Sequence, residues 1–146
     1  MTENAATSVE IPQGWTARQV IHESSRLRLE YTGPVLGATS NAVVAFAPFD
    51  FPFQSDRGGW GSASFCKRLM PHVCVFHRDE DWHQHDEFSQ AMRTCRSFFG
   101  PVPRLTSYGF SMGGYGAMLG AQGLNAARAV AVSPQSSIEP TAVKFE

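Results

Sequence analysis

The residues best suited to chemistry lie in a glycine-rich stretch late in the chain. Gly109, Ser111 and Gly113 form the pattern G-x-S-x-G. In this pattern a strand turns sharply into a helix, which strains the backbone of the central serine and leaves its hydroxyl exposed. A small residue two places to either side lets the strand and the helix pass closely. The pattern predicts a nucleophilic serine, with the N–H of Met112 placed to donate to an oxyanion.

The segments on either side of Ser111 support this interpretation. Residues 103–108 are typical of a short strand, and residues 112–123 combine small and apolar residues typical of a helix. The alternative is a glycine-rich strand-to-helix turn that carries an incidental serine. A dinucleotide fingerprint fits less well because the glycines are not spaced as G-x-G-x-x-G, and a P-loop is excluded because no lysine follows them.

The elements that must position this serine alternate along the chain. Continuous apolar residues at 42–47 predict a strand that is covered on both faces, whereas the strict polar–apolar alternation at 26–31 predicts a half-buried strand. Further strands are expected at 18–22, 72–77 and 128–132, and further helices at 62–69 and 87–99. This order predicts an α/β fold, a mostly parallel sheet with helices on both faces. Ligands bind at the carboxyl ends of such strands, which would gather residues 48–53, 78–86, 111 and 133–135 along one edge.

Length and composition predict one domain and exclude several partner classes. The chain has 146 residues, of which 42% are hydrophobic, and we expect a flexible leader at 1–14 and a single domain at 15–146. The formal net charge of −1 provides no basic field for nucleic acid or an anionic membrane. The start of the chain has no signal-peptide pattern, which predicts a cytoplasmic location. An odd number of cysteines (Cys66, Cys74 and Cys95) argues against a disulfide framework and favours small core residues.

Residues 42–140 resemble the α/β-hydrolase superfamily. The resemblance rests on the G-x-S-x-G motif, which this superfamily uses as a nucleophile elbow, and on the tail at residues 131–140. Both are similar to those of bacterial hydrolases and esterases with a G-x-S-M-G-G elbow. It implies Ser111 as the nucleophile and Met112 as one oxyanion donor. The second donor would come from the loop after residues 42–47, where Pro48 has no N–H, so Phe49 is the better candidate and Asp50 the next. We expect no cofactor and no metal.

The chain departs from this superfamily after the serine. There the triad runs serine, acid, histidine, but all five histidines of this chain precede Ser111, and only Glu139 and Glu146 are acidic after it. A serine hydroxyl needs a base to act as a nucleophile. Two explanations stay open. Either the chain is the N-terminal portion of a longer hydrolase and lacks its last strands, or a histidine from the loop at 78–86 substitutes.

His77, His83 and His85 are the histidines near that loop. His77 ends a predicted strand, at the edge where Ser111 is expected. For His83 and His85, which lie among carboxylates, we expect a solvated polar loop. A metal site is the sharper alternative, but no second ligand cluster exists in the sequence to complete it. The remaining possibility is that these histidines contact the substrate or act as the general base, with Asp81 and Trp82 as pocket residues.

Other residues bear on the substrate. Phe49, Phe51, Phe53 and Trp60 either pack a surface loop onto the core or line an apolar acyl or aryl pocket. With Asp50, Asp81, Trp82 and Gln135, they make up the candidate substrate contacts.

We therefore predict a serine hydrolase that transfers an acyl group from a small ester or thioester. The alternative is a catalytically inactive, hydrolase-like binding or scaffold module. In a sheet that ends at residues 128–132, the last strand would be an exposed edge, which predicts a homo-oligomer.

Overall fold

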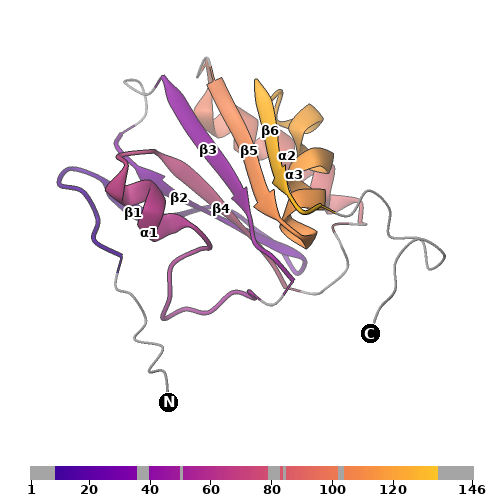
Figure 1. The fold of residues 1–146 in the computed structure, drawn as a ribbon, viewed down its shortest axis with the longest axis horizontal. Coiled ribbons are helices and arrows are strands. Elements are labelled where there is room, and N and C mark those ends of the chain that lie inside the picture. The colour runs from indigo at the N-terminus through magenta and orange to yellow at the C-terminus, as the bar shows by residue number, and fades with distance from the viewer. Residues whose placement is uncertain are drawn as a thin grey trace.

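The computed structural model of the chain describes residues 9–35, 40–49, 51–78, 83, 85–101 and 104–134. Strands and helices alternate from β3 onward, as Figure 1 shows. The strands are β1 (Thr16–Glu23), β2 (Leu27–Gly33), β3 (Asn41–Phe46), β4 (His72–His77), β5 (Arg104–Phe110) and β6 (Arg128–Val132). The helices are α1 (Ser62–Lys67), α2 (Glu87–Phe99) and α3 (Met112–Gly123).

The described strands form one six-stranded sheet in the order β1-β2-β4-β3-β5-β6. Strands β4, β3, β5 and β6 run parallel to one another, while β2 pairs antiparallel with β4, and β1 pairs antiparallel with β2. The β1–β2 hairpin turns at Ser24, whose hydroxyl accepts hydrogen bonds from the N–H groups of Arg26 and Leu27. The predicted mostly parallel α/β sheet is therefore confirmed.

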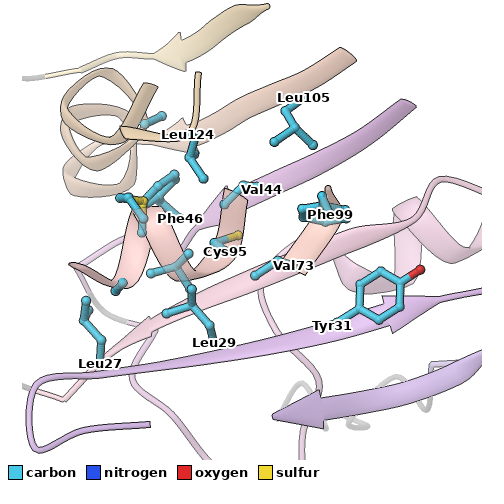
Figure 2. Packing of buried hydrophobic residues seen from close by; sticks show 14 of the residues in the cluster. Leu27, Leu29, Tyr31, Val44, Phe46, Val73, Cys95, Phe99, Leu105 and Leu124 are labelled. Carbon is cyan, nitrogen blue, oxygen red and sulfur yellow. The ribbon is translucent and has the colours of Figure 1, made fainter. Parts of the chain in front are cut away.

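Helices cover both faces of this sheet, and the larger core lies under α2 and α3. Phe88, Met92 and Cys95 of α2 share one face of that helix and pack on the apolar side chains of the four inner strands. Figure 2 shows this cluster, in which Leu29, Val44 and Val73 point toward Cys95 and Phe99. Helix α1 lies against the opposite face, which residues 51–61 also cover.

The prediction that β2 is half-buried is wrong. Its alternating polar positions are also covered, and Glu30 and Thr32 are almost fully buried. The cause is long-range: residues 53–55 lie over this face of β2, and Arg18 and Arg28 hold the Glu30 carboxylate there. The alternation of polar and apolar residues shows which side chains are polar, but it cannot show that a distant loop folds over the polar face.

The three cysteines are unpaired, buried thiols, as predicted. Burial raises the pKa of Cys74 and of Cys95 to about 12, so both behave as small core residues. Val9 lies close to Gly58, so the chain is in contact with the domain before residue 15. The division at residues 14 and 15 remains a prediction. None of the helices in the described ranges combines the length and the apolar character that crossing a membrane requires.

Candidate functional site

Ser111 occupies the single residue between β5 and α3. Its backbone angles, φ 54° and ψ −119°, lie in a region that glycine adopts easily and that other residues rarely adopt. Its N–H donates to the carbonyl of Val132 over 3.0 Å, and its carbonyl accepts the N–H of Tyr115 over 3.1 Å. The sharp, strained bend predicted from the G-x-S-x-G spacing is therefore present, with a half-buried serine at its apex.

Glycines make this bend possible because the backbones of β5, α3 and β3 approach one another too closely for a side chain to fit between them. A Cβ at Gly109 would overlap the carbonyl of Gly113, and a Cβ at Gly113 would overlap the carbonyl oxygen of Phe46. Gly116 and Gly120 continue the same face of α3, against the ring of Phe46. Glycine lowers the intrinsic stability of a helix, so these positions serve close approach rather than helix formation.

The first turn of α3 presents backbone donors next to Ser111. The Met112 side chain is fully buried, which fixes the start of the helix. The N–H groups of the first residues of a helix have no carbonyl partner within that helix, and the helix dipole adds partial positive charge there. A developing negative charge beside Ser111 would therefore be stabilised.

The carboxyl end of β3 reaches the same turn. The carbonyls of Phe46 and Ala47 both lie close to Gly113, and Phe49 follows two residues later with a partly exposed side chain. Phe51 N–H donates to the Pro48 carbonyl over 3.1 Å, so the backbone turns around Phe49. Phe49 therefore lies just after β3, the strand that pairs with β5 beside the elbow, as predicted. Asp50 lies outside the described residues.

The carboxyl end of β6 also contacts the start of α3. The Val132 carbonyl binds the Ser111 N–H, and Pro134 contacts the position of Gly114. The predicted gathering of strand ends at one edge is confirmed for these described residues. The predicted substrate contacts Asp81, Trp82 and Gln135 fall outside the described residues, so their role stays a prediction.

His77 stands level with Ser111 but on another strand. Phe46 of β3 is opposite both Val75 of β4 and Gly109 of β5, so His77 and Ser111 each lie two residues beyond that row. Because β3 runs between the two strands, their backbones are separated by about 10 Å.

The expectation of a solvated loop is wrong for His83. Its side chain is only 3% exposed. Its ring lies 4.9 Å from that of Phe88 and 5.9 Å from that of Phe46, and a Cβ at Gly116 would come within 2.9 Å of it. His85 is half-buried, with its ring 6.4 Å from Phe88. Charged neighbours in the sequence suggested solvent, but the missing side chain at Gly116 leaves space in which the His83 ring packs.

A serine–histidine pair, which the sequence did not reveal, lies at the opposite end of β4 from His77. The Ser62 hydroxyl is 2.7 Å from Nε2 of His72, and Nδ1 of His72 is 2.9 Å from the Met70 carbonyl. Nδ1 therefore donates to Met70 and Nε2 accepts from Ser62. Burial lowers the pKa of His72. His72 begins β4 and Ser111 follows the end of β5, so this pair lies away from the elbow and ties α1 to the sheet.

The aromatic residues after β3 divide between two roles. Phe53 packs edge-on against Phe76 with ring centroids 5.3 Å apart, and Trp60 stacks on Tyr108 at 5.2 Å. These two rings pack their loop onto the sheet, which is the first of the two predicted interpretations. Phe49, by contrast, is 41% exposed, and its role in contacting a ligand stays a prediction.

The described ranges contain no group of three His, Cys, Asp or Glu side chains arranged to hold a metal ion.

The chain is similar in structure to several solved proteins. No family model and no curated protein sequence matches the chain. One similar structure is the capsule O-acetyltransferase of Neisseria meningitidis serogroup A, an H228A mutant in complex with CoA, with a TM-score of 0.61 and 15% identity over 99% of this chain and 61% of that one.

Two further structures have comparable scores. One is esterase 2 of Thermogutta terrifontis, phosphoramylated by tabun, with a TM-score of 0.55 and 15% identity over 94% of this chain and 64% of that one. The other is a Glycosylation Associate Protein complex from Streptococcus agalactiae, with a TM-score of 0.59 and 16% identity over 83% of this chain and 24% of that one. The chain thus spans less than two thirds of each of these structures.

At such identities the likeness concerns the fold alone. The chain has an α/β-hydrolase-like fold.

Proposed function

We propose that this protein transfers acyl groups from a small ester or thioester by way of a covalent intermediate on Ser111. The observation that carries the proposal is the backbone of Ser111, held at φ 54° between β5 and α3. Strain of this kind persists only where the surrounding structure enforces it, and it collects at functional sites. In a nucleophile elbow such a backbone presents the serine hydroxyl beside the first turn of a helix, and we propose this role for Ser111.

The proposed reaction follows from the neighbours of Ser111. Its Oγ attacks the acyl carbonyl and passes its proton to a base, and the carbonyl oxygen becomes an oxyanion. The N–H groups of Met112 and Phe49 donate to that oxyanion, the intermediate collapses, and the alcohol or thiol leaves with a proton. Water or another alcohol then takes the acyl group from Ser111. Loss of one oxyanion donor in such a site costs about 10²- to 10³-fold in turnover.

The base is the open part of this mechanism. His77 is level with Ser111 on the sheet, but its strand β4 lies on the far side of β3 from β5. This observation favours the second candidate function, an inactive hydrolase-like binding module. The two candidates differ in whether Ser111 reacts.

The similar structures support an acyl-transfer chemistry without fixing the substrate. One is an O-acetyltransferase bound to CoA, and another is an esterase phosphoramylated by tabun. For this chain we propose that exposed Phe49 contributes an apolar contact to the acyl group. Asp50, Asp81, Trp82 and Gln135 remain the proposed polar and aromatic contacts to the rest of the substrate.

The test is hydrolysis of p-nitrophenyl acetate by the native, full-length protein, compared with Ser111→Ala. The proposal predicts turnover with an initial burst of p-nitrophenol, which reports the acyl-enzyme. It also predicts that Ser111→Ala removes the burst, while Ser89→Ala on the exposed face of α2 keeps it. A folded wild-type protein without a burst, or a burst that survives Ser111→Ala, would favour the binding module.

A further inference from the structure

A group of arginine side chains fastens the segment after Phe49 to the sheet. Arg18 of β1 donates from Nη1 to the Ser55 carbonyl over 2.9 Å and from Nη2 to the Gln54 carbonyl over 3.4 Å. Arg28 of β2 lies over the ring of Phe53, 4.6 Å from its centroid. Consecutive residues 53, 54 and 55 are thus each held by one of two arginines from the β1–β2 hairpin.

The two arginines share one buried anchor. The Glu30 carboxylate accepts from Nε of Arg18 and from Nε of Arg28, each over 2.7 Å, and its side chain is only 2% exposed. A buried carboxylate is tolerated only when it is paired in this way. Both guanidinium groups are therefore fixed in direction, since each must serve Glu30 and the loop at the same time.

The backbone of β1 is shaped for this contact. Arg18 has a positive φ of 51°, which is rare for a residue with a side chain, and the pairing of β1 with β2 shifts register between Thr16 and Gln19. Its N–H donates to the hydroxyl of Thr32 over 3.0 Å. An irregularity of this type redirects one side chain out of the regular alternation of a strand. Here it coincides with the arginine that reaches the loop.

A third arginine continues the attachment toward Phe49. Arg57 donates to the Pro52 carbonyl over 2.8 Å and lies 3.7 Å from the centroid of the Phe51 ring. Phe51 in turn donates its N–H to Pro48. The backbone N–H of Arg57 also donates to the Gln54 carbonyl over 3.4 Å, the same carbonyl that accepts from Arg18, so contacts lead from buried Glu30 to the turn that contains Phe49.

We propose that Arg18, Arg28 and Glu30 form a clamp that holds the loop after β3 so that the Phe49 N–H faces the oxyanion at Ser111. The clamp rests on the proposed function. These three are positioning residues, because they act through the loop and not on the substrate. An oxyanion donor stabilises charge that exists only in the transition state, so the clamp affects kcat more than KM.

The experiment compares wild type, Arg18→Met and Arg18→Lys in the native, full-length protein. Arg18 is 31% exposed, so its replacement disturbs packing less than a change at buried Glu30. Methionine keeps the apolar stem, while lysine keeps the charge but lacks the fork that serves Glu30 and two carbonyls together. Arg93→Met, an exposed position on α2 across the sheet, is the matched control.

Two readouts decide the proposal. In both Arg18 variants, amide hydrogen exchange at residues 51–58 should rise about tenfold, while exchange in β3 and β4 stays unchanged. With p-nitrophenyl acetate, kcat should fall about tenfold or more with little change in KM, because a small misplacement of a donor is costly. Arg93→Met should match wild type in both readouts.

Other outcomes would overturn the clamp. Unchanged exchange at residues 51–58 would show that Arg18 does not hold the loop. Faster exchange with unchanged kcat would show that the loop does not position a donor. Wild type that is inactive toward the ester would refute the proposed function, and the exchange comparison would then decide the attachment of the loop by itself.

Discussion

Replacing Ser111 by glycine should stabilise the protein relative to replacing it by alanine. Both changes remove the hydroxyl, so their difference isolates the backbone at φ 54° and ψ −119°. Alanine must carry the strain of this conformation, which costs about 1–3 kcal/mol, whereas glycine adopts it freely. Glycine loses about 0.4–1 kcal/mol through the greater freedom of its unfolded chain. The balance favours Ser111→Gly by about 1 kcal/mol, or about 4 °C in Tm for a chain of this size.

Urea denaturation and thermal unfolding of the two variants measure this difference. The control is the same pair of changes at Ser89, an exposed residue within α2. There the order should reverse, with Ser89→Gly less stable than Ser89→Ala by up to about 1 kcal/mol, because glycine has a lower helix propensity than alanine. If the Ser111 variants follow the same order as the Ser89 variants, the strained bend does not exist in solution, and the argument from strain to function fails.

Three further predictions concern the packing around the elbow, the buried histidine and the sheet edge. Gly113→Ala should lower the free energy of unfolding by about 1–3 kcal/mol or more in urea denaturation, because its Cβ would meet the backbone of Phe46, while Gly120→Ala, which meets only side-chain ends, should cost less. The depressed pKa of His72 means that the unfolded chain takes up a proton first, so the free energy of unfolding should decrease as pH falls below about 6.5, and His72→Gln should flatten this slope. Among the described residues β6 lies at one edge of the sheet with Val130 and Val132 exposed, so a protein of residues 1–146 should self-associate in sedimentation as its concentration rises. Val130→Arg should reduce this self-association, and a monomer at all concentrations would contradict the prediction.

The elements that depend on local sequence were predictable. Residues 112–123 were expected as a helix and form α3 with those bounds, because small residues follow directly after the bend. The continuous apolar run at β3 indicated a strand buried on both faces, which the structure confirms. The strain at Ser111 was also predictable, since the glycines at 109 and 113 leave only one residue in which the chain can turn.

Contacts between distant residues were not predictable from patterns. Glu30 belongs to a polar–apolar alternation that indicates an exposed face, yet Arg18, 12 residues earlier, and the loop at residues 53–55 bury it. Neither contact produces a periodic pattern in the sequence. Likewise, nothing local shows that His83 packs beside Gly116 on α3. The sequence therefore indicated the nucleophile candidate and its immediate neighbours, but not the side chains that support the loop beside them.

Reaction of the native, full-length protein with a fluorophosphonate probe tests the central claim most directly, because such a probe bonds only to an activated serine. Mass spectrometry of the digested adduct should locate the modification on Ser111, and Ser111→Ala should remain unlabelled while Ser89→Ala is labelled as wild type. A folded protein that stays unlabelled, or an adduct on a different serine, would contradict the assignment of Ser111 as the nucleophile.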